Sequence, residues 1–538
     1  MQSFRTEFEN PIVERDIIYL EQKIRAYRDG NMAEDKFKSL RLARGIYGQR
    51  QPGVQMIRIK LPFGKITFKQ LLRIADISDE YASSNLHLTT RQDIQIHYVS
   101  LDKTPELWAK LEQDNVTQRE ACGNTVRNVT ASPTAGIDPL EPFDVSPYAH
   151  ATFEYFLRNP ICQEMGRKFK MAFSSSEADT AFSYIHDLGF VPKVKVYNGE
   201  EQRGFKVMLG GSLGAQPMLG YVVHEFLPEN EVIPYAESVL RVFDRYGERN
   251  NRNKARFKFL IQKSGLDEVI RLIDEERTAN KSKSYAVNRD AIPLPNIPGE
   301  QNFPDVEVKD EKHYQEWLKT NVFEQKQKGF YGVYVKVPVG DIPSDKAREF
   351  VGAISSLVAD EIRITQNQGL LLKYVRKEAL PVLFNNLEKL GMADPGFDSV
   401  AEVVELILAQ RFSRLQGKVQ LVDLFPDLTR DQLASGAREA ASLGDARPQR
   451  VRISVGEDQE VGGGKVRVLL DSGCIRLAGP ARLHQRLPER TRRGTQVARF
   501  DRREVLDVSH ARGVLRSLQK ATQPVEVLCD ATQHQDAP

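Results

Sequence analysis

Three short segments of the sequence place basic side chains where they could bind a small anion. The segments are TTRQDIQIH (residues 89–97), GNTVRNVTASP (123–133) and GRKFKMAFS (166–174). If the third is a strand, alternation points Lys168 and Lys170 to one side and Phe169 to the other, so two ammonium groups can converge on one anion. Arg127 lies in a loop beside Gly123, where its guanidinium could present a planar fork to an oxyanion. Such cations stabilise developing negative charge, and the lysines could relay protons.

The first segment, read as a strand, also has a polar face. Alternation places Arg91, Asp93, Gln95 and His97 on one side of the sheet. A polar strand face is more often solvated than functional, and each basic motif taken alone is more simply a surface arginine or a pair of surface lysines. The functional interpretation therefore needs support from the rest of the chain.

A glycine-rich stretch, VMLGGSLGAQPMLG (207–220), is a weaker signal. Gly210 and Gly211 could let the backbone approach a large planar cofactor, although a tight turn between two strands explains them nearly as well. The stretch lacks the G-x-G-x-x-G spacing of a dinucleotide loop.

Composition narrows the functional classes. The chain has 538 residues, and 76 basic against 73 acidic side chains leave a net charge of +3, which does not favour nucleic acid or an acidic membrane as a partner. The amino terminus is not typical of a signal peptide and no run of 18 apolar residues occurs, so we expect a cytoplasmic protein. Four cysteines are too sparse for a disulfide framework. We expect Cys122 and Cys162 to be buried structural thiols and assign neither His97 nor His150 to a metal.

An internal repeat organises the chain up to residue 400. At an offset of 276 residues, IRIKLPFGK (57–65) aligns with VYVKVPVGD (333–341), and LTTRQDIQIHYV (88–99) aligns with ITQNQGLLLKYV (364–375). Each copy has the pattern of strand, loop, helix, strand, hairpin and second helix. The repeat therefore predicts a ferredoxin-like α+β half that is used twice.

The three basic segments in this order, together with the repeat, resemble the siroheme-dependent nitrite and sulfite reductases over about residues 45–400. The resemblance implies a cationic cage around iron-bound sulfite or nitrite, formed by Arg91, Arg127, Lys168 and Lys170. It also implies that siroheme contacts residues of both copies, namely Thr90, Gln92, Asn128, Gly210, Gly211, Thr365, Asn367 and Gln368.

The activity that the resemblance implies is six-electron reduction of sulfite to sulfide, or of nitrite to ammonia, with a ferredoxin or flavoprotein as electron donor and with siroheme and a 4Fe-4S cluster as cofactors. The sequences R-N-V and Q-x-H within these motifs favour sulfite slightly. The implied fold is α+β, with two ferredoxin-like half-domains related by the repeat and a siroheme/iron–sulfur reductase α/β domain. The expected parts are a helical extension (1–48), the first half-domain (49–114), the first reductase domain (115–300), a linker (301–325), the second half-domain (326–400) and an atypical tail (401–538).

The tail departs from the family pattern. Residues 401–538 hold 19 Arg but only 3 Lys and 3 aromatic side chains. The family's cluster requires four cysteines, in a T-A-C-P-G segment and a later C-x-x-x-C. The first segment is absent after residue 403, and SGCIRLAG (472–479) offers Cys474 as the single candidate ligand, with Ala478 in place of the next cysteine. Either the tail is a frame-shifted or rearranged second reductase domain, or it is genuine and the chain is an inactive member without the cluster.

Overall fold

The computed structural model describes residues 10–214, 216–299 and 306–397, together with the backbone of four short strands between residues 454 and 528. The chain divides into two compact units, one of residues 1–212 and 218–395 and the other of residues 213–217 and 396–538. In the second unit the four strands form an antiparallel sheet. They are β16 (Ser454–Gly456), β17 (Lys465–Leu470), β18 (Gly473–Ala478) and β19 (Glu526–Leu528).

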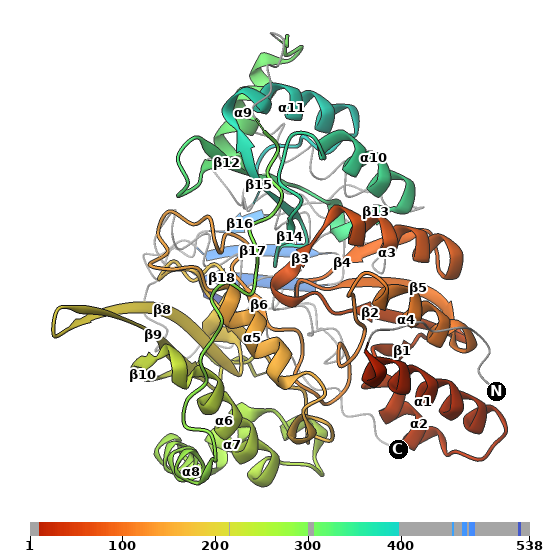
Figure 1. Cartoon of the computed structure of the whole chain (residues 1–538), viewed down its shortest axis with the longest axis vertical. Coiled ribbons are helices and arrows are strands. Elements are labelled where there is room, and N and C mark those ends of the chain that lie inside the picture. The colour runs from red at the N-terminus through yellow and green to blue at the C-terminus, as the bar shows by residue number, and fades with distance from the viewer. Residues whose placement is uncertain are drawn as a thin grey trace. The chain divides into compact units, whose positions relative to one another are not determined.

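Two five-stranded antiparallel sheets of the first unit correspond to the two copies of the repeat (Figure 1). The first has the order β1 (Ile46–Gly48), β2 (Val54–Ile59), β5 (Ile94–Ser100), β4 (Asn85–Leu88), β13 (Asp341–Pro343). The second has the order β11 (Val322–Glu324), β12 (Phe330–Val335), β15 (Leu370–Arg376), β14 (Ile362–Ile364), β3 (Lys65–Ile66). Each copy thus lends one short strand, β3 or β13, to the sheet of the other copy. The predicted α+β repeat is confirmed, and the exchange of strands is an addition that the sequence did not indicate.

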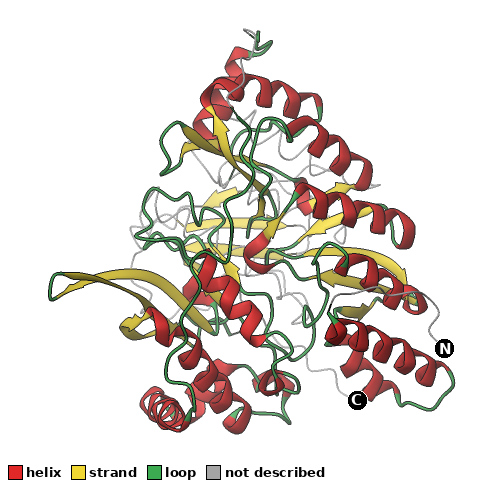
Figure 2. Cartoon of the chain, in the orientation of Figure 1, coloured by secondary structure: helices red, strands yellow, loops and turns green. Residues whose placement is uncertain are grey.

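Helices of the two copies pack together and share one hydrophobic core with the sheets (Figure 2). They are α3 (Phe68–Tyr81), α4 (Thr104–Glu112), α10 (Ser344–Ile354) and α11 (Leu380–Lys389). Thr67 begins α3 with a capping box, in which its hydroxyl accepts from the Gln70 N–H at 3.2 Å and the Gln70 amide oxygen accepts from the Thr67 N–H at 3.0 Å. Alternation along β5 buries Ile94 and Ile96 in this core and leaves Gln95 on the opposite face.

Equivalent glutamines of the two copies make matching contacts with the other copy. Gln92 and Gln368, 276 residues apart, both have left-handed backbones, with φ of 58° and 64°. The Gln92 amide donates to the Ile364 carbonyl at 2.9 Å, and the Gln368 amide donates to the Leu88 carbonyl at 2.7 Å. Because Leu88 and Ile364 are also 276 residues apart, the two hydrogen bonds are reciprocal and join the copies.

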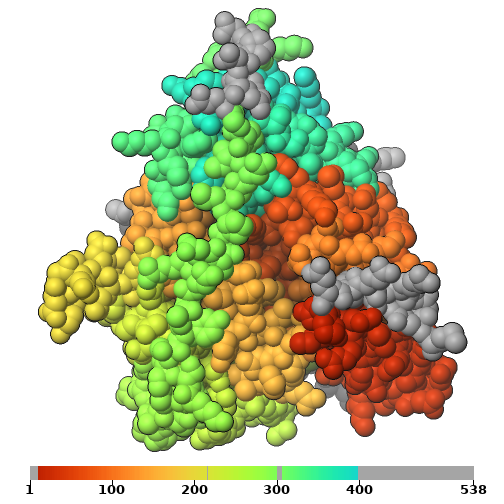
Figure 3. Space-filling view, viewed as in Figure 1, coloured from red at the N-terminus to blue at the C-terminus, as the bar shows by residue number. Residues whose placement is uncertain are grey.

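A third sheet of the first unit lies between the two copies in the sequence and has its own core. Its order is β10 (Tyr221–Pro228), β9 (Glu200–Leu209), β8 (Leu188–Tyr197), β7 (Met171–Phe173), β6 (Thr130–Ala131). The strands β6, β7 and β8 pair in parallel, and the β8–β9 hairpin projects beyond them (Figure 3). Its helices are α5 (Ser146–Phe156), α6 (Val232–Tyr246), α7 (Phe257–Ser264) and α8 (Leu266–Ala279).

The amino-terminal extension is helical as predicted, with α1 (Pro11–Arg28) and α2 (Glu34–Leu42), and Ile17, Leu20 and Ile24 of α1 are buried. The predicted linker over 301–325 is wrong in its second part, because α9 (Glu311–Asn321) and β11 occupy it and Trp317 is fully buried. The prolines before residue 305 are typical of a linker, but they end before the amphipathic segment that forms α9. The remaining boundaries stay a prediction. No helix of the described residues is long and apolar enough to cross a membrane.

Candidate anion-binding site

The turn between β4 and β5 positions the first candidate arginine. The Thr89 hydroxyl accepts hydrogen bonds from the N–H groups of Arg91 at 3.2 Å and Asp93 at 3.1 Å, and the Gln92 N–H donates to the Thr89 carbonyl at 2.9 Å. Thr90 is half-buried in this turn. The predicted strand alternation is therefore wrong at Arg91, because the left-handed Gln92 interrupts it and the strand begins at Ile94.

The Arg91 guanidinium is held by Thr130 of the third sheet and by two residues in segments next to that sheet. It donates to the Thr130 hydroxyl at 3.1 Å, to the Asn128 carbonyl and to His186 Nε2, while its Nε–H has no acceptor in the described structure. The other His186 nitrogen lies 2.8 Å from the Phe182 carbonyl, which fixes the neutral tautomer with Nε2 as acceptor. Burial, with Arg91 and then Lys170 nearby, keeps the pKa of His186 well below its ordinary value.

The second candidate arginine is engaged by its own loop. Arg127 donates from Nε and Nη2 to the Gly123 carbonyl, at 3.1 and 2.9 Å, and from Nη1 to the Ala121 carbonyl at 3.2 Å. Three of its five N–H groups are thus used, and two remain for a ligand. Asn128 next to it donates to the Leu61 carbonyl at 2.6 Å and to the Arg91 carbonyl at 3.0 Å, which ties this loop to the β4–β5 turn.

The two candidate lysines flank a buried phenylalanine, as alternation predicted. Phe169 pairs with Val126 in an isolated parallel bridge and is fully buried, whereas Lys168 and Lys170 are half-buried. Neither ammonium group forms a hydrogen bond or ion pair with any residue that the structure describes. Burial and then Arg127 lower the pKa of Lys168 to about 6, and burial and Lys168 lower that of Lys170 well below its ordinary value.

These four candidates therefore lie close enough to shift one another's pKa values, since Arg91 acts on Lys170 and Arg127 acts on both Arg91 and Lys168. Further basic side chains missed by the sequence analysis join them, namely Arg58, Arg167 and Arg256. The Arg256 guanidinium is fixed by buried Asp187, at 3.0 and 2.8 Å from its two carboxylate oxygens. We call these seven side chains the cationic cluster. Arg256 follows Lys170 by more than 80 residues, so no local motif could reveal it.

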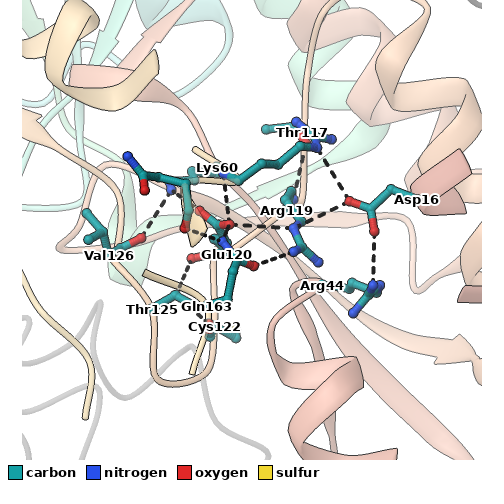
Figure 4. A network of polar contacts seen from close by, with 12 residues as sticks. Asp16, Arg44, Lys60, Thr117, Arg119, Glu120, Cys122, Thr125, Val126 and Gln163 are labelled. Carbon is teal, nitrogen blue, oxygen red and sulfur yellow. Dashed lines mark hydrogen bonds and ion pairs between the residues drawn. The ribbon is translucent and has the colours of Figure 1, made fainter. Parts of the chain in front are cut away.

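A network of buried polar groups supports the loop that carries Arg127 (Figure 4). Glu120 has a left-handed backbone with φ of 60°, and its carboxylate accepts from the Gln163 amide at 2.8 Å and the Arg158 N–H at 3.0 Å. Lys60 lies 4.0 Å from the other Glu120 oxygen and donates to the Val126 carbonyl at 3.2 Å. The network continues to α1.

Asp16 of α1 joins that network through Arg119, which also lies 3.6 Å from Glu120. The Asp16 carboxylate accepts from Arg44 at 3.0 Å and lies 3.4 Å from both Arg119 and Arg158 (Figure 4). The helical extension is therefore part of the scaffold that holds the loop.

Two of the three candidate residues of the second copy, Thr365 and Gln368, form hydrogen bonds within the protein. Thr365 and Gln368 are buried, and the Thr365 hydroxyl accepts from the Gly369 N–H at 3.0 Å. Asn367, the repeat partner of Arg91, is half-buried. The Gln92 amide oxygen accepts from the Ala131 N–H at 3.0 Å, so both of its amide atoms are used. A cofactor role for these residues stays a prediction.

Packing within the chain is enough to explain the two candidate glycines. A Cβ on Gly211 would lie 2.1 Å from the Tyr184 carbonyl oxygen, and a Cβ on Gly210 would lie 2.4 Å from an Ile261 methyl carbon. The close approach that requires glycine is therefore to the chain itself, and contact with a cofactor stays a prediction.

The two implied cofactors fit these residues differently. Siroheme carries several carboxylates, and the cationic cluster offers buried Nε–H groups of Arg91, Arg167 and Arg256 without an acceptor in the described structure, so the residues fit such an anion. A 4Fe-4S cluster needs four thiolates. Cys122 and Cys162 are buried and free, burial raises the pKa of the Cys162 thiol, and the described residues hold no group of three potential metal ligands. They do not fit the cluster. Cys474 lies outside the residues whose side chains are described.

Comparisons with known proteins agree with this arrangement. The model of the nitrite and sulphite reductase 4Fe-4S domain matches residues 122–282, and that of the nitrite/sulfite reductase ferredoxin-like half domain matches 47–114 and 323–390. The chloroplastic ferredoxin–nitrite reductase of Zea mays is 28% identical over 352 residues, covering 63% of this chain and 57% of that protein. A ferredoxin sulfite reductase of Mycolicibacterium paratuberculosis is 29% identical over 249 residues, covering 43% and 44%.

The matched part thus spans about half the length of these relatives. The structure of the Mycobacterium tuberculosis NirA protein has the same fold, with a TM-score of 0.59 at 20% identity over 85% of each chain. Both copies of the repeat and the domain between them match models of one family, in the order that the structure shows. This chain belongs to the nitrite and sulfite reductase family.

Proposed function

We propose that this chain binds siroheme and a small oxyanion at the cationic cluster and reduces sulfite to sulfide, or nitrite to ammonia, by six electrons. The observation that carries the proposal is the pair Lys168 and Lys170, two half-buried lysines without a protein counter-ion among the described residues. Burying such groups is costly unless an anion joins them. The relatives of Zea mays and Synechococcus elongatus are named ferredoxin–nitrite reductases, which supports ferredoxin as the electron donor.

When bound, siroheme supplies an iron that holds the substrate and passes electrons to it. The chain's own residues hold the anion and its protons. Arg91 is fixed by His186 and Thr130, so it offers a cation whose position does not change when the substrate arrives. Lys168 and Lys170 have lowered pKa values, so their ammonium groups readily release protons to the negative charge that reduction places on the substrate.

A second function is favoured by the cysteines. The full sequence has four, and two of them are buried thiols in the described part. A chain that cannot build the 4Fe-4S cluster would bind siroheme or an anion without receiving electrons. This candidate is an inactive family member whose residues 401–538 differ from the second reductase domain, and translation of the coding DNA near residue 400 in all three frames tests it.

The experiment that separates the two functions is an absorbance spectrum with iron and acid-labile sulfide assays on the full chain, purified without oxygen from cells that make siroheme. Siroheme bands, labile sulfide and reduction of sulfite or nitrite with an artificial donor support the enzyme. Siroheme bands without labile sulfide or turnover support the inactive member. A colourless chain overturns the siroheme site. Replacing Lys168 and Lys170 by Met should weaken anion binding, whereas Lys195→Met on the exposed hairpin is the control.

A further inference from the structure

Asp93 is a buried carboxyl beside the cationic cluster that the proposed function does not use. It lies between the β4–β5 turn and β5, and its side chain is 2% exposed. Its Oδ1 accepts no hydrogen bond, and its carboxylate forms no ion pair with any described residue. A buried carboxylate without a partner is costly and calls for an explanation.

Cations from three elements act electrostatically on this carboxyl without forming an ion pair with it. They are Arg58 and Lys60 at the end of β2, Arg91 in the turn and Arg127 in the loop after Gly123. Lys60 and Arg127 donate to backbone carbonyls instead. Burial prevails over these cations and raises the pKa of Asp93 to about 6. The group can therefore exchange a proton near neutral pH.

The repeat excludes a structural role for the carboxylate in the turn. Gly369 is the counterpart of Asp93 in the second copy, and its N–H donates to the Thr365 hydroxyl at 3.0 Å, as the Asp93 N–H donates to Thr89 at 3.1 Å. The same turn therefore forms with no side chain at this position. Since the turn does not need the carboxyl, its charge is what distinguishes the turn of the first copy.

We propose that Asp93 couples anion binding at the cationic cluster to the uptake of one proton. Without substrate, the carboxylate partly neutralises the cluster. When sulfite or nitrite binds among the same cations, the two negative charges repel and Asp93 takes up a proton, which is then stored beside the substrate. At a separation of about 6 Å and an effective dielectric constant of about 20, this repulsion strengthens proton binding about a hundredfold. The inference rests on the proposed function, because it requires an anion at this site.

The test is calorimetric titration of the full chain with sodium nitrite, which stays a monoanion near neutral pH, in buffers of different ionisation enthalpy. Wild type should take up about 0.8 proton more than D93N at about pH 7. Its dissociation constant should rise about twentyfold more than that of D93N between about pH 6 and about pH 8. Lys168 and Lys170 also take up protons in both proteins, so the difference between them reports Asp93.

Two further variants sharpen the result. D93E keeps an ionisable group and should restore the difference in proton uptake, whereas D102N removes an exposed carboxylate and should behave as wild type. Equal proton uptake and parallel affinity profiles in wild type and D93N overturn this inference and leave the proposed function standing. Failure of every variant to bind nitrite at any pH overturns the anion site itself, and the inference with it.

Discussion

Asp93→Asn should stabilise the protein at neutral pH although it removes a charge that lies among cations. The carboxyl has a pKa of about 6 in the folded state against 3.8 for a free carboxyl, so the folded state binds its proton more tightly than the unfolded state. Below pH 3.8 the two states carry the same proton and the carboxyl costs nothing. As pH rises, the folded state loses stability until its own pKa is passed.

The magnitude follows from the separation of the two pKa values. A separation of about 2.2 pH units at 1.36 kcal/mol each gives a penalty of about 3 kcal/mol at pH 8, and about 1.6 kcal/mol of it is already present at pH 5. Asparagine carries no charge and removes the penalty. The free energy of unfolding of D93N should therefore exceed that of wild type by about 3 kcal/mol at pH 8 and by about half of that at pH 5.

Tryptophan fluorescence in a urea titration measures this difference without interference from the second unit. The chain has two tryptophans, Trp108 in α4 and Trp317 in α9, and both are buried in the first unit. D102N is the control, because Asp102 is exposed and pairs with Arg28 at the surface. The reasoning would be refuted if D93N gained the same stability over wild type at both pH values, or if it lost stability at pH 8.

Three more outcomes follow from other buried contacts. Glu361→Gln should cost about 3–5 kcal/mol in the same titration, because it leaves Arg363 and Lys373, which lie 2.8 and 3.0 Å from the carboxylate, buried without a counter-charge; an effect below 1 kcal/mol would contradict this. Gln92→Ala and Gln368→Ala should each lower the free energy of unfolding by about 1–3 kcal/mol. Because both hydrogen bonds join the copies, the two effects should combine non-additively, and strict additivity in a double-mutant cycle would argue against that coupling. Both described cysteines should react with a thiol reagent only after urea is added, and rapid labelling of the native chain would show that they are not buried.

The sequence predicted what depends on periodicity and repetition. The alternation around Phe169 indicated that this side chain is buried between two more exposed lysines, and the offset of 276 residues indicated two equivalent halves. These features are local, or compare one segment with another, so a single sequence contains them.

Contacts between distant segments could not be predicted in this way. Asp187 fixes Arg256 across 69 residues and His186 fixes Arg91 across 95, and neither pair has a spacing that a motif records. The left-handed backbone at Gln92 was missed for a different reason. Glutamine has no preference for that conformation, and tertiary contacts of its amide at both ends hold it there.

The two copies of the repeat share the same backbone turn but differ in the charge that the turn carries. The turn of the first copy carries Arg91 and Asp93, whereas the matching turn carries Asn367 and Gly369. Both turns form an equivalent hydrogen bond to a threonine hydroxyl, from the Asp93 N–H and from the Gly369 N–H, so this bond forms with either set of side chains. At the proposed site, the anion would therefore meet the two halves of this frame unequally, because the two charged side chains, Arg91 and Asp93, occur in the first copy only.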